Sequence, residues 1–459
     1  MKRTPLQALT PETLRNAHEN SSPVVPETAT ADALYDVAVI GGGPAGMMAA
    51  GRAAERGLKV VLLEKNDSLG RKLLITGGGR CNVTNAETDT RTLLAKFKDS
   101  DKYLFSTFSQ YGVADAFDFF HSRNMPTKVE AEKRVFPLSN KAQSVWDVLV
   151  EYMKSGSVTV KSNAAVVGFV MEQEIERNEQ GVGGQKKITA LKLKDGSLIR
   201  AKNFVLATGG KSHPETGSTG DGFKWLAQMG HVVSEPRAAL VPVKVSDEWV
   251  RDLSGFSLPQ AKITLFQNGA KVPGKQSVKK GKVLFTHFGL SGPAVLNMSS
   301  EIDELLKYGE VVLSLDLLPA HDYATLNEAL QKLFKKQSNK KFKNALSALI
   351  PSSLVSTIVT QSGIDEEVAC HSVTREERLA LVKLLKGVPI HPTGLLGADK
   401  AIITSGGVSL DEIDWKTMRS RLVPNLHIVG DLLDIDRPSG GYSLQLCWTT
   451  GWVAGSSAN

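Results

Sequence analysis

Three glycines near the start of the chain have the spacing of a dinucleotide phosphate-binding turn. Gly41, Gly43 and Gly46 follow the apolar run 35–40, which is typical of a strand, and open a helix-period stretch over 44–56. In such a G-x-G-x-x-G turn the first glycine allows the tight turn, the second lets a pyrophosphate approach the backbone, and the third lets helix and strand pack closely. The pyrophosphate then lies on the helix N-terminus, whose free N–H groups favour an anion. The candidate phosphate-binding residues are Gly41, Gly43, Pro44, Ala45 and Gly46.

An acidic residue at the end of the next apolar run supports a nucleotide site. The run 59–63 closes a β-α-β unit. Glu64 follows at the distance where a carboxylate binds the ribose hydroxyls of an adenosine. Its charge disfavours NADP, because it would repel a ribose phosphate. Lys65 comes directly after it and is included among the candidate cofactor-binding residues.

Two later segments point to FAD as the dinucleotide. The segment 205–210 is an apolar strand ending in Ala-Thr-Gly-Gly, and it resembles the second nucleotide-contacting segment of two-dinucleotide flavoproteins. The segment 426–431 ends in Gly-Asp, and in that superfamily the acid at this position holds the ribityl chain of FAD. The same resemblance implies an adenine contact from the run 158–169. These segments add Val166, Thr208, Gly209, Gly210, Gly430 and Asp431 to the candidate cofactor-binding residues.

A glycine-rich segment flanked by cations covers residues 70–85. Its glycines indicate a backbone that lies against a ligand, beside cations that pair with anionic groups. Cys81 has no C-x-x-C partner, which excludes a dithiol relay and favours a packed, inert thiol over a redox role. The candidates from this segment are Arg71, Lys72, Gly77, Gly78, Arg80, Cys81 and Asn82.

A Gly-Gly turn precedes the last helical segment, which we expect over 448–454. Backbone N–H groups of Gly440 and Gly441, with Tyr442 beside them, are candidates for contact with the flavin pyrimidine edge. The positive end of the helix would stabilise charge on the reduced flavin. An ordinary helix start is the alternative interpretation.

Few residues are candidates for acid–base catalysis. His287 and His213 lie in glycine-rich loops, where catalytic groups often occur. His287 is the one we put forward as catalytic, with a local loop hydrogen bond as the alternative. Tyr442 could also donate a proton.

Composition excludes several classes of protein. The chain has 459 residues, 41% of them hydrophobic and 22% charged, as expected of a globular protein with two or three domains. Its three cysteines are far apart, and no run approaches the roughly 20 apolar residues of a membrane-spanning helix. From these two features we expect a cytoplasmic protein. No metal-binding or P-loop motif occurs, so we expect no metal and no P-loop chemistry. The net charge of +7 includes lysine-rich stretches at 271–282 and 332–343, interpreted as solvated faces rather than nucleic-acid sites.

The remaining pattern divides the chain into regions. Residues 1–33 lack hydrophobic periodicity and predict a disordered tail. A second β-rich region covers 239–315, and a largely helical, lysine-rich region covers 322–387. Shorter expected elements are helices over 113–123 and 139–154, strands over 158–169, 188–193, 197–200 and 204–207, and a hairpin-type loop at 181–184.

Seven segments together resemble one bacterial flavoprotein family, which includes aminoacetone-oxidase-like and dehydro-bile-acid-reductase-like proteins. They are GGGPAG, GRKLLITGGGRCNVTN, EKRVFPLSNKAQSV, LATGGKSHPETGSTGDG, THFGLSGPAVL, TSGGV and VGDLLDIDRPSGGYSLQLCWTTG. The resemblance implies an α/β fold with a discontinuous Rossmann-type, glutathione-reductase-like FAD-binding domain and an inserted β-barrel plus helical domain. The expected bounds are 34–225 and 391–459 for the FAD-binding domain, 226–318 for the barrel-like domain and 319–390 for the helical subdomain. Asp431 and Ser443 stand where many relatives carry Glu and Asn.

The reaction class follows from these motifs and from the resemblance. Only one G-x-G-x-x-G occurs, so we expect no stable NAD(P)H domain, although NADH or NADPH could bind transiently as co-substrate. We predict an FAD-dependent oxidoreductase that transfers a hydride through flavin N5 on an unidentified small molecule. The family leaves open an NAD(P)H-dependent reductase or an amine oxidase. The alternatives are a flavin-dependent nucleic-acid-modifying protein and a non-catalytic FAD redox module.

Overall fold

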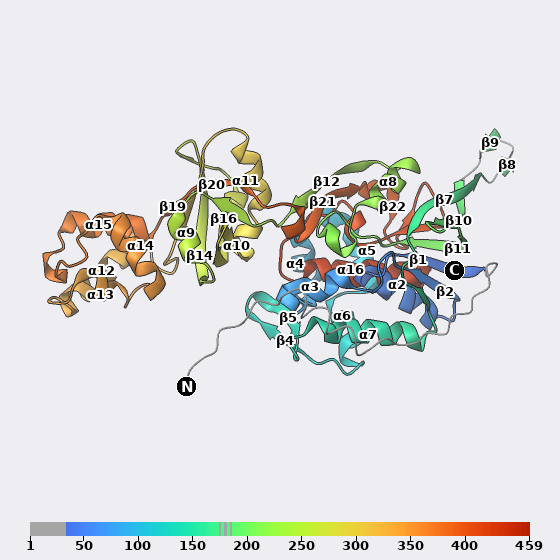
Figure 1. Ribbon diagram of the computed structural model, residues 1–459, viewed down its shortest axis with the longest axis horizontal. Helices are drawn as coiled ribbons and strands as arrows, with labels where there is room; N and C mark the ends of the chain where they lie inside the picture. The colour runs from blue at the N-terminus through green and yellow to red at the C-terminus, as the bar shows by residue number, and fades with distance from the viewer. Residues whose placement is uncertain (1–33, 174–175, 179–180, 184–185) are drawn as a thin grey trace.

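The computed structural model describes residues 34–173, 176–178, 181–183 and 186–459. The tail predicted over 1–33 and Gly184 lie outside the described residues. Two large hydrophobic cores organise the chain, one on each side of a narrow connection. Figure 1 shows the two bodies along the long axis of the molecule, joined by the antiparallel pair β12 (Val233–Ala239) and β21 (Ile403–Val408).

A mixed sheet forms the centre of the first body, which we call the FAD body because the sequence predicts the FAD-binding domain there. β1 (Tyr35–Ile40) pairs parallel with β11 (Leu198–Leu206) and β2 (Val60–Leu63), and β11 pairs parallel with β24 (Leu426–Ile428). The carboxyl ends of three parallel strands, from the start, middle and end of the chain, therefore lie side by side. The sheet runs in the order β22 (Ile413–Asp414), β23 (Arg419–Ser420), β24 (Leu426–Ile428), β11 (Leu198–Leu206), β1 (Tyr35–Ile40), β2 (Val60–Leu63) and β6 (Thr159–Lys161), with β10 (Lys186–Leu193) and β7 (Val166–Gln173) joined through β11.

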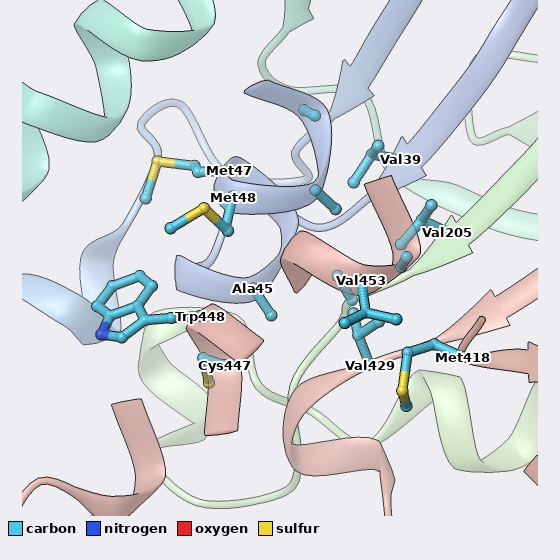
Figure 2. Close-up of a cluster of buried hydrophobic side chains, with 14 of the residues drawn as sticks. Val39, Ala45, Met47, Met48, Val205, Met418, Val429, Cys447, Trp448 and Val453 are labelled. Atoms are coloured by element: carbon cyan, nitrogen blue, oxygen red, sulfur yellow. The ribbon is translucent and has the colours of Figure 1, made fainter. Parts of the chain in front are cut away.

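Two helices pack closely beneath this sheet, α2 (Pro44–Glu55) and α16 (Tyr442–Ser457). A Cβ at Gly451 would lie 2.4 Å from the Ala45 carbonyl oxygen, so α16 approaches α2 at a distance that only glycine permits there. Figure 2 shows Cys447 and Trp448 of α16 beside Ala45 and the two methionines of α2. The prediction of a final helix over 448–454 was too short, because this packing begins at the first turn of α16.

Smaller elements complete the FAD body. The glycine-rich segment 70–85 ends in β3, which pairs with β5 in a short sheet of the order β3, β5, β4. These elements are α3 (Arg71–Gly79), β3 (Thr84–Asn85), α4 (Thr90–Leu94), α5 (Asp101–Gln110), α6 (Val113–His121), β4 (Thr127–Glu130), β5 (Arg134–Pro137), α7 (Ala142–Ser155), α8 (Asp221–Gln228), and the pair β8 (Glu176–Asn178) and β9 (Gly181–Gly183).

The inserted body consists of an antiparallel sheet and a helical part that share the second core. The helical part lies farthest from the FAD body in Figure 1. The strands are β13 (Val243–Val245), β14 (Ser257–Gln267), β15 (Ala270–Lys271), β16 (Val278–Thr286), β17 (Gly289–Ser291), β18 (Val311–Asp316), β19 (Val388–Ile390) and β20 (Pro392–Leu395). The helices are α9 (Glu248–Asp252), α10 (Pro293–Leu296), α11 (Ser299–Leu306), α12 (Tyr323–Lys336), α13 (Phe342–Leu346), α14 (Ser352–Ser362) and α15 (Arg375–Leu385).

Two strand predictions and one loop prediction were wrong in detail. The run 158–169 is two strands, because Asn163 adopts a left-handed conformation and the chain turns there to bond the loop after β2. The runs 197–200 and 204–207 are one strand, β11, because its first half pairs with β10 and its second half with β1. The segment predicted as a loop at 181–184 contributes β9, which pairs with β8.

Candidate cofactor-binding cleft

A cleft opens where β1, β11 and β24 end and α2 begins. It holds about 1220 Å³ of space that is continuous with solvent. Its lining includes most of the predicted cofactor residues: Gly41, Gly43, Pro44, Ala45, Glu64, Lys65, Arg71, Lys72, Val166, Thr208, Gly209, Gly430 and Asp431. It also includes residues that the motifs did not indicate, among them Asn66, Thr76, Ser218, Trp225, Ile402, Ser443, Leu444 and Cys447.

The three glycines of the first turn have different surroundings. Gly41 has a φ of +106°, and a Cβ there would lie 2.5 Å from the Ala207 carbonyl oxygen. A Cβ at Gly46 would lie 1.9 Å from the carbonyl oxygen of Gly41, so helix and strand touch there. A Cβ at Gly43 would meet no atom within 4 Å, and Gly43 caps α2 without a side-chain hydrogen bond. The N-terminus of α2 therefore presents free N–H groups to open space, as an anionic pyrophosphate requires.

Glu64 and its neighbours form one end of the cleft. Glu64 is 8% exposed, and its carboxylate accepts from the backbone N–H groups of Gly42 at 2.8 Å and Asn66 at 2.9 Å. These bonds fix the carboxylate while leaving lone pairs for further donors such as ribose hydroxyls. Lys65 Nζ donates to Thr219 Oγ1 at 2.6 Å and pairs with Asp221 at 3.1 Å, which closes the rim at this end.

The segment after β11 supplies a buried polar atom without a partner. Thr208 Oγ1 is buried and has no hydrogen bond to any described residue, although Thr208 lines the cleft. A buried hydroxyl of this kind is expected to have a partner, and a bound cofactor would supply one. Gly210, also predicted as a cofactor residue, is outside the lining, and a Cβ there would lie 2.2 Å from Thr404 Oγ1.

A compact charge cluster lies at the end of β24. Asp431 bonds the guanidinium of Arg437, whose side chain is fully buried, and Lys72 Nζ lies 3.3 Å from the other carboxylate oxygen. Lys72 also donates to Ser212 Oγ at 2.6 Å, and Arg437 donates to Ser443 Oγ at 3.0 Å. Burial opposes ionisation of Asp431, but the charges of Arg437 and Lys72 outweigh it and lower the pKa of the carboxyl below its ordinary value. The cluster holds two cations and one anion, so it leaves net positive charge beside the cleft.

Part of the glycine-rich segment lies outside the cleft. Gly77 and Gly78 are exposed and left-handed, in a kink at the end of α3. Arg80 pairs with Glu130 at 2.5 Å. The side chain of Asn82 accepts from the backbone of β5. Burial raises the pKa of the Cys81 thiol to about 12, so the thiol is protonated and packed in the first core. The structure thus gives these residues roles in shaping the segment that leads to β3.

The Gly-Gly turn before α16 is held by β3 rather than by the cleft. Gly441 has a φ of +100°, and a Cβ there would lie 2.3 Å from the backbone of Thr84. Gly440 and Tyr442 are likewise outside the lining, and the Tyr442 side chain is buried against Phe97. The next two residues, Ser443 and Leu444, do line the cleft, so the first turn of α16 faces it.

The predicted histidines lie away from the cleft lining. His287 is exposed on the turn between β16 and β17 in the inserted body. His213 lies next to Glu215, with its Nδ1 2.7 Å from that carboxylate. No histidine occurs among the described residues that line the cleft. The ionisable side chains that do line it are Glu64, Lys65, Arg71, Lys72, Asp221, Asp431 and Cys447.

Two other features are absent from the described residues. No group of three or more His, Cys, Asp or Glu side chains among the described residues is arranged to hold a metal ion. No helix in that part of the chain is long and apolar enough to cross a membrane.

The glycine turn, the buried Glu64 and the strand ends around the cleft define a Rossmann-type dinucleotide-binding protein. The chain belongs to the family described as HI0933-like protein Rossmann domain, which matches residues 35–457. The chain is 31% identical to the ribosomal RNA dihydrouridine synthase of Escherichia coli over 91% of its length and 96% of that protein. It is 28% identical to the 3-dehydro-bile acid delta(4,6)-reductase of Clostridium scindens over 92% of its length and 98% of that protein.

Solved structures support the same fold. The 3-ketosteroid delta1-dehydrogenase of Sterolibacterium denitrificans superposes with a TM-score of 0.50 at 13% identity, covering 92% of this chain and 99% of that one. At this identity the match shows the fold alone. The predicted family and fold class are therefore confirmed, and the chain is an FAD-dependent oxidoreductase.

Proposed function

We propose that this enzyme reduces a carbon–carbon double bond conjugated to a carbonyl group. The observation that carries the proposal is that two relatives with different substrates, each aligned over more than nine-tenths of this chain, are named for such reductions. Dihydrouridine is uridine saturated at the double bond next to a ring carbonyl, and a delta(4,6)-reductase of a 3-dehydro compound saturates double bonds conjugated to its ketone. The shared element is an electron-poor alkene.

The residues of the cleft support this chemistry. Bound FAD would supply the hydride chemistry for this reduction, with NADH or NADPH as the co-substrate that provides the hydride and solvent as the source of the proton. The N-terminus of α2 and Glu64 would bind the pyrophosphate and the ribose. Lys72 and Arg437 would keep positive charge beside the cofactor, which favours its anionic reduced form.

An anaerobic titration tests the reaction class. The purified protein is titrated with NADH and then NADPH while the flavin absorbance is followed. Bleaching by one of them, followed by recovery of the absorbance when 2-cyclohexen-1-one or a uridine-containing RNA is added, is the expected result. Flavin that neither coenzyme reduces would instead favour an oxidase or dehydrogenase that takes electrons from its own substrate, and amines would be tested next.

Two molecules are candidates for carrying the double bond. The two relatives named as ribosomal RNA dihydrouridine synthases favour a uridine within RNA. The bile acid reductase favours a free small molecule, as the sequence led us to expect. The rate of flavin reoxidation is measured over a range of concentrations of each acceptor. The true substrate should act at micromolar rather than millimolar concentration, as typical KM values indicate.

A further inference from the structure

One face of the sheet in the inserted body carries lysines, two of which are exposed to solvent. β14 and β16 bury alternate residues such as Ile263 and Val283 in the second core. Because side chains alternate across a strand, the residues between them point to the other face. That face carries Lys262, which is half-buried, and Lys280 and Lys282, which are exposed. We call these three residues the lysine face.

The protein does not neutralise the lysine face. Lys262 is directly opposite Lys280 in the antiparallel register, a placement of like charges that destabilises a sheet. None of the three lysines has an ion pair with any residue in the described ranges. Asp316, opposite Lys262 on the other side, already pairs with Lys386 at 2.7 Å. A local cost without a compensating contact is typical of a functional surface.

An apolar patch borders the lysines on the same face. Phe266 lies four residues beyond Lys262 in β14, and Val312 of β18 is directly opposite it. Both residues are half-buried, whereas their neighbours Leu265 and Leu313 are fully buried in the second core. Cations beside an aromatic ring on a sheet are the combination that binds single-stranded nucleic acid, through phosphate contacts and base stacking.

The strand that carries two of the lysines also contacts the FAD body. A Cβ at Gly281 would lie 3.5 Å from Glu132 Oε1, on the segment between β4 and β5. Gly281 stands between Lys280 and Lys282, so its contact uses the opposite side of the strand from the lysines. The strand that carries Lys280 and Lys282 therefore approaches the FAD body with the side opposite to the lysines.

We propose that Lys262, Lys280 and Lys282 bind the phosphodiester backbone of single-stranded RNA. The inference rests on the proposed reduction of uridine in RNA and adds the surface that holds the polymer. It revises the interpretation of the stretch 271–282 as only a solvated face, because the register places Lys280 and Lys282 with Lys262 and without counter-charges. Phe266 favours RNA over an anionic membrane, which has no bases to stack.

The test compares two variants with the same change in charge. In the first, Lys262, Lys280 and Lys282 are all changed to Gln. In the matched control the changed residues are Lys332, Lys335 and Lys336, exposed lysines of α12 that have no ion pair with a described residue. Binding of a fluorescent uridine-rich single-stranded RNA to each FAD-loaded protein is measured by anisotropy over a range of salt concentrations. Vesicles containing phosphatidylglycerol serve as the second anionic probe.

Loss of the lysine face should lower the slope of log affinity against log salt by about two, since each phosphate contact on a single strand contributes about 0.7. Affinity at about 0.1 M salt should then fall by up to about a hundredfold. The α12 variant should retain RNA binding, and none of the proteins should bind vesicles strongly. An equal loss in both variants, or a loss of vesicle binding confined to the first variant, would overturn the proposal.

The binding readout is independent of the reaction. FAD content and the rate of flavin reduction by the coenzyme should be unchanged in the first variant, because its lysines lie outside the cleft lining. If no alkene reoxidises the flavin but RNA binding still depends on the lysine face, the proposed reaction fails and the surface stands. If the alkene is reduced and RNA binding does not depend on these lysines, only the proposed RNA-binding role of the lysine face is wrong.

Discussion

Acid should destabilise this protein through one buried histidine. His427 lies in β24 with its side chain fully buried, and its Nδ1 donates to the Thr417 carbonyl oxygen at 2.9 Å. Its Nε2 has no partner among the described residues. Burial lowers the pKa of His427 from 6.5 to about 4, because an imidazolium would lose its hydration there. The folded protein therefore keeps this ring neutral.

The sign and size of the effect follow from that difference. As the pH falls through 6.5 the unfolded chain takes up a proton that the folded chain accepts only near pH 4. Above the unfolded pKa the neutral imidazole costs the folded protein no stability. Below that pH the free energy of unfolding falls progressively. At about 1.36 kcal/mol for each pKa unit, the whole effect is about 3 kcal/mol, of which about 2 kcal/mol is lost by about pH 5.

The variant His427→Asn isolates this contribution. Asn can keep the donor to Thr417 but cannot be protonated. The free energy of unfolding in urea is measured for both proteins at about pH 7.5 and about pH 5, so that all other titrating groups cancel in the comparison. The parent should lose about 2 kcal/mol more than the variant. Because β24 leads directly to Gly430 and Asp431, FAD release from the parent should rise over the same pH range.

Equal losses in the two proteins would refute the reasoning. That result would mean that the imidazole is solvated or finds a partner when protonated, so that its pKa is not lowered by burial. A variant that is less stable than the parent by the same amount at both pH values would show only a packing defect.

Other predictions concern the cleft and the thiols. Gly43→Ala should fold normally, since its Cβ meets open space, yet bind FAD at least about tenfold more weakly. Gly46→Ala should also lower Tm, because its Cβ would lie 1.9 Å from the Gly41 carbonyl oxygen. A fluorescence titration and thermal melts distinguish the two, and equal Tm losses would contradict the assignment. Arg437→Met should cost about 3–5 kcal/mol in urea unfolding, because it leaves Asp431 buried with Lys72 alone, and Arg437→Lys should cost less. Cys81 and Cys447 should resist thiol reagents in the native protein, because burial raises the pKa of both to about 12; rapid labelling without unfolding would argue against this.

Local sequence determined the cofactor-binding turn. The spacing of Gly41, Gly43 and Gly46 sets a strand, a turn and a helix within a few residues, and Glu64 follows at the end of the next strand. Each role depends on neighbours within one β-α-β unit, so the pattern alone predicts it. The resemblance to a known family extended this to the later strands and to the inserted body.

Tertiary structure decided which other residues reach the cleft and which do not. Arg437 bonds Asp431 only because the loop after β24 folds back, and Trp225 reaches the lining from a helix more than a hundred and fifty residues after the turn. Gly77 and Gly78 carry the composition of a ligand-binding loop but end α3 in an exposed kink. Composition reports which backbone conformations a segment can adopt, whereas proximity to the cofactor depends on long-range packing that no local pattern encodes.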